Sequence, residues 1–375
     1  MVWYNLAANR KRWIQVLEIL GKEELEMSRK WQILVGLGAA ALLLISLIPG
    51  CAPAPEEGAP SKGGEATYKW RFATIMPEGA DCNLSSLRFA ENVLEASDGR
   101  IVVDCYPGGV LGDWQVIFEE NMRGTIEFSL NCLSTVYDPR IGVTYTPYLV
   151  TTWEEVKVMY APGGFVYEKL DELLGGIGIK LLSSWPSDFM GVGTGERPPS
   201  PKDPDVPKNM KIRVWADPAP EAIMERFGYL PTVLPWADTF SAFQMGVIDG
   251  VCTNLVSQWS YQRDLTNYWI YDHSLFEGWF YLMSLDVWNS LSPEDQKIVE
   301  DAALEEQRLR IESAEAAEQK NLQNFRDQGT EVILFTPEEL AELRQMAIED
   351  IWPKLYGKLG RQILDEAAAA AEALK

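Results

Sequence analysis

The segment from Met210 to Gly250 constrains the fold of this chain more than any other. Along this segment, runs with the alternating apolar pattern of a strand alternate with runs that have the pattern of a helix. A glycine ends each helical run. Strands are expected at 211–215, 230–234 and 247–254, and helices at 221–227 and 238–245. Such alternation is typical of a parallel α/β sheet. We therefore predict the α/β fold class.

The preceding half of the chain repeats this alternation. Strands are expected at 68–75, 100–106, 125–132 and 177–184, and helices at 84–96, 113–123 and, with a break at Pro162-Gly163-Gly164, 151–174. A chain of 375 residues exceeds one domain of ordinary size. We predict two lobes, each a mainly parallel sheet flanked by helices: lobe I from residues 67–188 plus 279–320, and lobe II from residues 189–278 plus 321–375.

One long helix is expected after Ser292, which together with Pro293, Glu294 and Asp295 forms a strong helix start. No helix breaker follows until Gly329, a distance of roughly 35 residues or about 52 Å. A helix of that length outruns a single lobe, so we predict that it spans both. Two lobes joined in this way are the layout of a clamshell solute receptor, which closes on its ligand by a hinge motion.

Residues 1–50 have the pattern of a secretory signal peptide, in which Ser28-Arg29-Lys30 precedes an apolar run from Ile33 to Ile48. The run is short for a membrane span, which needs about 20 residues. An uncleaved transmembrane anchor is therefore the less favoured alternative. We predict that translation starts at Met27, which gives a signal peptide of ordinary length. The protein is expected outside the cytoplasm, in the periplasm or on the outer face of the cell membrane.

Cys51 stands directly after Gly50 and three residues after Ile48, in a pattern that resembles the lipobox of bacterial lipoproteins, although Pro49 is unusual there. We predict that Cys51 is lipidated and that the lipid anchors the protein to the membrane. Residues 51–66 are rich in Pro, Gly, Glu and Ala, and they are expected to form a flexible tether.

Composition excludes several classes of function. The net charge of −22, with no basic run after the first thirty residues, argues against nucleic acid as a partner. His273 is the only histidine, so Ser-His-Asp chemistry and His-rich metal sites have no support, and we predict neither a cofactor nor a metal. Four cysteines remain besides Cys51, and they show no CxxC spacing: Cys82, Cys105, Cys132 and Cys252. They could be buried free thiols or form disulfides, and the sequence does not decide between these alternatives.

Arg213 is the leading candidate for a binding residue. It stands between Ile212 and Val214 in a strand, so it lies on the face opposite to that apolar pair and near the carboxyl end of the strand. Ligands of open parallel sheets bind in the crevice beyond such ends. A guanidinium matches a carboxylate through two parallel N–H···O bonds, which a lysine cannot reproduce. From spacing alone, a surface or interdomain salt bridge is slightly favoured over a ligand site.

Several short motifs, in this order and spacing, resemble one protein family. They are Gly99-Arg100-Ile101-Val102, Tyr106-Pro107-Gly108-Gly109-Val110-Leu111-Gly112, Gly124-Thr125-Ile126-Glu127, Lys211-Ile212-Arg213-Val214 and Gln244-Met245-Gly246-Val247-Ile248-Asp249-Gly250. The family is that of the solute-binding proteins of tripartite ATP-independent periplasmic (TRAP) transporters, DctP type, and the resemblance covers residues 66–375. It implies a periplasmic-binding-protein-like clamshell, a receptor rather than an enzyme, and the membrane permease subunits of the transporter as partners.

The resemblance implies that Arg213 binds a substrate carboxylate and that Trp236 packs on the ligand. Two departures from the family are visible. Relatives often carry a second cleft arginine upstream, where this chain has Met190 to Thr194, and Asn254 is shifted by one position from an asparagine of the family. These departures weaken an assignment to sialic acid or to a C4 dicarboxylate.

Three tryptophans stand at or just beyond expected strand ends, and we place them at the cleft: Trp185, Trp215 and Trp236. Most tryptophans pack in cores and interfaces. If these three line the cleft, the ligand has an apolar or aromatic body behind its carboxylate. The predicted ligand-binding residues are therefore Arg213 and Asn254 together with these tryptophans.

The predicted function is that of an extracytoplasmic TRAP receptor, which binds a small organic anion through an Arg–carboxylate pair and lobe closure. Two alternatives stay open. An exported hydrolase would use a pair of carboxylates, although no spacing singles out such a pair. A solute-sensing subunit of a signalling system would bind the same solute and differ only in its membrane partner.

Overall fold

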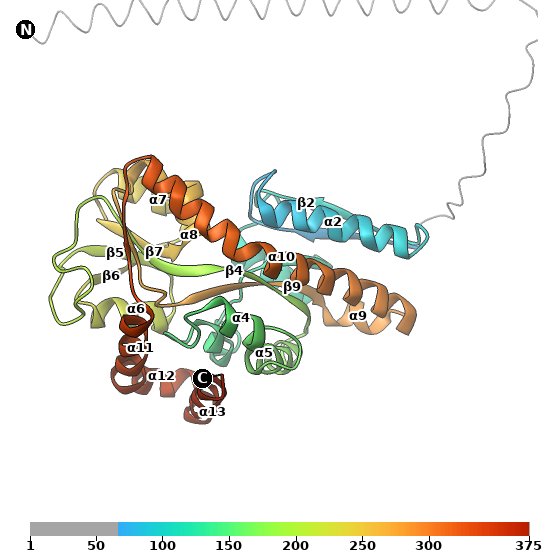
Figure 1. Cartoon of the computed structure of the whole chain (residues 1–375). Helices are drawn as coiled ribbons and strands as arrows, with labels where there is room; N and C mark the ends of the chain where they lie inside the picture. The colour runs from blue at the N-terminus through green and yellow to red at the C-terminus, as the bar shows by residue number, and fades with distance from the viewer. Residues whose placement is uncertain (1–66, 375) are drawn as a thin grey trace, which may run out of the picture. The chain divides into compact units, whose positions relative to one another are not determined.

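The computed structural model describes residues 67–374 (Figure 1). The predicted signal peptide, the start at Met27, the lipidated Cys51 and the tether lie outside the described residues. Within residues 67–374, no helix combines the length and the apolar character needed to cross a membrane. The residue boundaries predicted for the two lobes stay predictions.

The first group of strands forms as the alternation predicts. Its elements are β1 (Tyr68–Ala73), α2 (Asp81–Ala96), β2 (Ile101–Tyr106), α3 (Trp114–Arg123) and β3 (Phe128–Asn131). Strand β1 pairs in parallel with both β2 and β3. Gly124 ends α3 with a left-handed backbone, φ 71°, which a glycine adopts without strain.

The chain then runs through η2 (Pro139–Tyr145), α4 (Trp153–Met159) and α5 (Phe165–Gly175). The break predicted within residues 151–174 is confirmed, because α4 ends before Pro162 and α5 begins after Gly164. A Cβ atom at Gly164 would lie 2.1 Å from the carbonyl oxygen of Val158, so the tight turn between the two helices requires glycine.

Strand β4 (Ile179–Thr194) is longer than predicted. The prediction that it ends at Ser184 is wrong, since the chain continues as a strand past Pro186. Proline is tolerated there because the pairing with β9 (Phe276–Ser284) shifts register between Pro186 and Asp188, at an irregularity that needs no regular ladder bond. All but one of its residues are buried, so no polar alternation marks its end in the sequence.

The second group of strands contains β5 (Lys211–Val214), α6 (Pro218–Arg226), β6 (Leu230–Val233), α7 (Trp236–Gln244) and β7 (Gly250–Asn254). Strand β5 pairs in parallel with β6 and β7. Strand β7 starts three residues later than predicted, because Gly246 has φ 70° and the chain turns after α7 before it re-enters the sheet.

The remaining elements complete both groups. They are α8 (Leu255–Ser257), η3 (Gln258–Gln262), η4 (Arg263–Leu265), β8 (Tyr268–Tyr271), β9, α9 (Leu285–Ser290), α10 (Pro293–Asp327), β10 (Glu331–Leu334), α11 (Pro337–Met346), η5 (Ala347–Ile351), α12 (Trp352–Leu359) and α13 (Arg361–Glu372).

The strand order is β2-β1-β3-β9-β4-β7-β5-β6, with β8 on β4 and β10 on β8. Residues Ile179 to Phe189 of β4 pair with β9, the last five residues pair with β7, and the last three also pair with β8. The predicted two-lobed α/β fold is confirmed. The sheets are mixed, because β4 and β9 connect the lobes and run antiparallel to their neighbours, whereas β1–β3 and β5–β7 are parallel.

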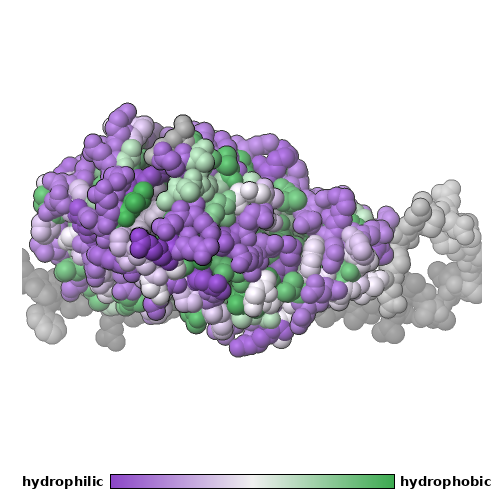
Figure 2. Space-filling model, turned by 90° about the horizontal axis from the view of Figure 1, so that it is seen from below, coloured by the Kyte–Doolittle hydropathy of each residue, from purple (hydrophilic) through white to green (hydrophobic). Residues whose placement is uncertain are grey.

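Hydrophobic side chains fill two large cores. One contains Phe72, Phe89 and Phe128 of the first strand group, and the other extends from α4 and α5 to the C-terminal helices. The face drawn in Figure 2 is mostly hydrophilic, with hydrophobic residues in small groups among the polar ones. Cys82, Cys105, Cys132 and Cys252 are all free thiols. Burial raises the pKa of Cys82 to about 12, so this thiol stays protonated at neutral pH.

The long helix α10 has 35 residues, as predicted, and the side chain of Ser292 accepts a hydrogen bond from the N–H of Asp295 at its start. It packs against α2, β4, α8 and β10, and so contacts both strand groups (Figure 1). Its buried face is partly polar. Glu306, Arg310 and Glu318 on that face each bind a different part of the molecule.

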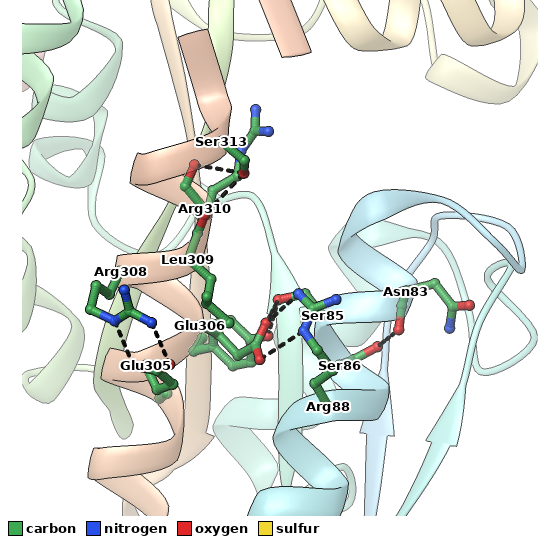
Figure 3. A network of polar contacts seen from close by, with 12 residues as sticks. Asn83, Ser85, Ser86, Arg88, Glu305, Glu306, Arg308, Leu309, Arg310 and Ser313 are labelled. Atoms are coloured by element: carbon green, nitrogen blue, oxygen red, sulfur yellow. Dashed lines mark hydrogen bonds and ion pairs between the residues drawn. The ribbon is translucent and has the colours of Figure 1, made fainter. Parts of the chain in front are cut away.

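Glu306 ties α10 to α2 (Figure 3). Its buried carboxylate accepts hydrogen bonds from Nε and Nη2 of Arg88, at 3.1 and 2.6 Å, and from the hydroxyl of Ser85, at 2.6 Å. The Ser85 hydroxyl also lies 2.6 Å from the hydroxyl of Tyr281 on β9. Helices α10 and α2 thus meet at this carboxylate, and Ser85 links them to β9.

We expect Glu306→Ala to lower the free energy of unfolding by about 2 kcal/mol, because it leaves Ser85 and the half-buried Arg88 without their partner. The neighbouring Glu305 supplies the control, since it pairs with Arg308 on the exposed face of the same helix. Glu305→Ala is expected to change stability by less than about 1 kcal/mol. Urea unfolding of both variants measures the two effects, and equal losses would contradict the buried network.

Candidate functional site

Arg213 lies inside the molecule without an acidic partner. Its side chain is buried, with 5% of its surface exposed, while Ile212 and Val214 fill the core on the other face of β5. Its Nε donates a hydrogen bond to the carbonyl oxygen of Leu234, at 3.0 Å. No carboxylate among residues 67–374 forms an ion pair with it. Burial lowers the pKa of Arg213 to about 10, so the guanidinium is charged at neutral pH.

The guanidinium faces a cavity of about 610 Å³, part of which is open to solvent. Side chains from both strand groups line the cavity: Ile75, Met76, Trp114, Cys132, Tyr145, Met190, Arg213, Trp215, Trp236, Thr253, Ser257, Tyr261, Glu277 and Trp279. We call this space the Arg213 cavity.

Aromatic rings form much of the wall of the Arg213 cavity. The guanidinium carbon of Arg213 lies 5.3 Å from the centre of the Trp236 ring, which fixes both side chains by a cation–π contact. Trp236 also meets Tyr261 edge to face, with ring centres 5.6 Å apart, and Trp215 meets Tyr145 in the same way at 5.5 Å. The cavity therefore combines one cation with flat apolar surfaces.

A second hollow of about 1000 Å³ adjoins the Arg213 cavity and shares Arg213, Trp215 and Trp236 with it. The loop after β2 forms its opposite side, with Gly108, Gly109 and Gly112. Gly112 has φ 129°, and a Cβ atom there would lie 2.6 Å from Cγ1 of Val116. Gly112 thus lets this loop pack closely against the start of α3.

The structure brings three of the predicted site residues together and sets two apart. Arg213, Trp215 and Trp236 line the same cavity. Trp185 and Asn254 line a neighbouring one, where the ring of Trp185 packs 4.5 Å from the guanidinium carbon of Arg310 on α10. Asn254 caps α8 by accepting a hydrogen bond from the N–H of Ser257, at 2.6 Å.

Asn254 reaches the Arg213 cavity only indirectly, because its amide nitrogen donates a hydrogen bond to the carboxylate of Glu277. Arg197 is the basic residue nearest in the sequence to the position of the missing family arginine. It forms an exposed ion pair with Glu331 at 3.2 Å. It lies outside the lining of the Arg213 cavity.

Glu277 is the principal site residue that sequence reasoning missed. It is the second residue of β9, it is partly buried, and it is the one carboxylate among the lining side chains. Burial raises the pKa of Glu277 to about 7, and the hydrogen bond from Asn254 opposes that rise. The sequence held a signal for it, since Glu277 is the single charged residue in the apolar run from Leu275 to Met283.

Four aromatic residues of the lining were also missed: Trp114, Tyr145, Tyr261 and Trp279. The chain has 14 tryptophans and 14 tyrosines, so residue type alone cannot select these. His273 has a structural environment. Its ring stacks on Phe189 at 4.2 Å, its Nδ1 lies 2.8 Å from the carbonyl oxygen of Thr151, and burial lowers its pKa to about 4.

Comparison with known proteins decides the family. The model of the bacterial extracellular solute-binding protein family 7, DctP, matches residues 72–358. The chain belongs to this family. It is a DctP-type solute-binding protein of the TRAP class, as the motifs predicted, and the family consists of extracellular solute-binding proteins.

Relatives of this DctP protein have differing ligands in their names. The chain is 26% identical over 320 residues to the ectoine-binding periplasmic protein TeaA of Halomonas elongata, covering 82% of this chain and 91% of that protein. It is 22% identical over 302 residues to the C4-dicarboxylate-binding protein DctB of Bacillus subtilis, covering 79% and 85%. The crystal structure of the sugar acid binding protein DctPAm from Advenella mimigardefordensis with galactonate has a TM-score of 0.73 at 21% identity, covering 82% of this chain and 98% of that one, which supports the fold.

Proposed function

We propose that this protein is the extracytoplasmic receptor of a TRAP transporter and that it binds a small organic acid in the Arg213 cavity. The observation that carries the proposal is a buried guanidinium that lines a cavity with aromatic walls and forms no ion pair with the described residues. Burying an unpaired charge is costly. Such a group is expected where a ligand of opposite charge forms an ion pair with it.

Arg213 would bind the carboxylate through its two terminal nitrogens, since Nε is already occupied by the carbonyl of Leu234. Trp236 would hold the guanidinium in place and present its ring to the body of the ligand. Trp215 and the tyrosines of the wall would exclude water around that body. Closure of the two lobes would then bury the ligand between the glycine loop after β2 and the strand that carries Arg213.

The proposal includes the cellular context predicted from residues 1–66. The receptor would be exported by the signal peptide, lipidated on Cys51 and held at the membrane, where it delivers its ligand to the permease subunits. Relatives named for ectoine, C4 dicarboxylates and sugar acids support an organic acid as the ligand class. A hydrolase with paired carboxylates is not supported, because the Arg213 cavity is lined by one carboxylate, that of Glu277.

A thermal-shift screen of the purified protein against organic acids tests the proposal. A ligand at a hundredfold excess over its dissociation constant stabilises the protein by about 2.7 kcal/mol, which raises the unfolding midpoint by roughly 5 °C or more. Mass spectrometry should recover that ligand intact. The absence of any stabilising acid in a broad panel would count against the proposal. Turnover of the ligand would show that the protein is an enzyme and not a receptor.

A further inference from the structure

Glu277 places a negatively charged side chain in the Arg213 cavity in addition to the positively charged Arg213. We call these two charged side chains the poles of the cavity. Its carboxylate lines the cavity from β9, whereas Arg213 lines it from β5. One oxygen of Glu277 accepts a hydrogen bond from Asn254, which satisfies only part of the hydrogen-bonding capacity of a carboxylate. Neither Glu277 nor Arg213 takes part in an ion pair within residues 67–374. The two opposite charges therefore share one cavity without neutralising each other by contact.

Among residues 67–374, Arg213 is the charged group that acts electrostatically on Glu277. The titratable groups with an electrostatic influence on Glu277 or from it are Arg213, Cys132, Tyr145 and Cys252. Burial raises the pKa values of both thiols and of the tyrosine, so these three groups are neutral at pH 7. A cation that enters the cavity beside Glu277 would thus meet a carboxylate with no competing protein cation except Arg213.

The walls of the cavity suit an organic cation. Trp215, Trp236, Trp279, Tyr145 and Tyr261 surround the space between the two poles. The faces of tryptophan and tyrosine rings attract quaternary ammonium and other delocalised cations, and the attraction is strongest where water is excluded. A metal ion would instead require several oxygen ligands. The described residues contain no group of three His, Cys, Asp or Glu side chains that could hold one.

We propose that the ligand is a zwitterion, with its carboxylate on Arg213 and an organic cation between Glu277 and the aromatic walls. The inference rests on the proposed function, and it specifies that the end of the ligand opposite the carboxylate carries a positive charge. A dicarboxylate would bring its second negative charge toward Glu277, and like charges at such a site oppose binding. Zwitterions of the ammonium-carboxylate and amidinium-carboxylate kinds meet both poles at once.

Matched ligand pairs test this inference by calorimetry on the full protein. Glycine betaine and 3,3-dimethylbutanoate have the same shape and differ in the charge of one atom, and ectoine, carnitine and 4-aminobutyrate extend the zwitterion panel beside acids of matched size. At pH 8 we expect at least one zwitterion to bind more than tenfold tighter than its matched acid. Glu277→Gln should abolish that preference, because the amide keeps the shape and loses the charge, whereas Glu277→Asp should keep part of it.

The pH dependence gives an independent readout. Because the pKa of Glu277 is raised to about 7, the carboxylate becomes protonated as the pH falls through 7. Affinity for the zwitterion should then fall by about tenfold per pH unit below 7, and affinity for a plain acid should stay level or rise. The exposed Glu305→Gln serves as the control variant and should leave both profiles unchanged.

The possible results separate the two proposals. Plain acids that bind through Arg213 as tightly as zwitterions, or that bind only with added Na⁺ or Ca²⁺, would overturn the zwitterion inference and leave the receptor function intact. If neither plain acids nor zwitterions bind, both proposals fail. A zwitterion preference that survives Glu277→Gln would also overturn the inference.

Discussion

The Arg213→Ala variant is expected to bind the ligand at least tenfold more weakly than the native protein. Hydrogen bonds between charged groups contribute roughly 1.5 to 3 kcal/mol each, and the alanine removes the guanidinium that would make two of them. Arg213→Lys should recover little of the loss, since an ammonium cannot form the same parallel pair of bonds. Isothermal titration with the acid found in the thermal-shift screen measures both variants.

The stability of the ligand-free protein distinguishes a binding role from a structural one. Arg213 forms no ion pair in the described part of the chain, and burial of its charge opposes folding. Arg213→Ala should therefore unfold at the same urea concentration as the native protein or at a higher one. Arg197→Ala is the matched control, because its exposed pair with Glu331 lies outside the cavity, and it should leave affinity unchanged. Native affinity in Arg213→Ala would refute the assignment.

The Arg310→Ala variant is expected to lose about 3 kcal/mol of stability. Arg310 is buried on α10 and donates hydrogen bonds to the carbonyl oxygens of Pro186, at 2.6 Å, and of Ser187. These carbonyls lie at the register shift between β4 and β9, before β4 begins to pair with β7 and β8. The alanine leaves two buried acceptors without partners and removes the cation that packs on Trp185.

Urea unfolding of Arg310→Ala measures this loss. Arg308 supplies the control two residues away, since it forms ion pairs with Glu305 and Glu312 on the exposed face of the same helix. Arg308→Ala should leave stability nearly unchanged, because exposed ion pairs contribute little to it. If Arg310→Ala were as stable as the native protein, the long helix would not be held to the strand that joins the lobes through this side chain.

Much of the fold follows from local sequence signals. The glycines that stop α3 and α6, and Ser292 and Pro293 at the start of α10, mark element boundaries through backbone geometry that a reader of the sequence can recognise. The end of β4 could not be found in this way. Pro186 usually ends a strand, and it is accepted here only because the partner strand β9 shifts register beside it.

The site residues on a single strand could be predicted from the sequence. The site residues that come together from strands far apart in the sequence could not. Arg213 and Trp215 stand next to each other at the end of β5, and a family motif marks them. Glu277 joins them because β4 pairs with both β7 and β9, a tertiary arrangement that no local pattern encodes. The same arrangement turns Trp185 toward Arg310 and leaves Asn254 to contact Glu277 instead of the cavity.

A crystal structure of the protein with its bound ligand tests the central claim most directly. The account predicts a carboxylate of the ligand within hydrogen-bonding distance of both terminal nitrogens of Arg213, with the ring of Trp236 beside the ligand. A ligand bound instead in the neighbouring cavity, between Trp185 and Asn254 and away from Arg213, would contradict it.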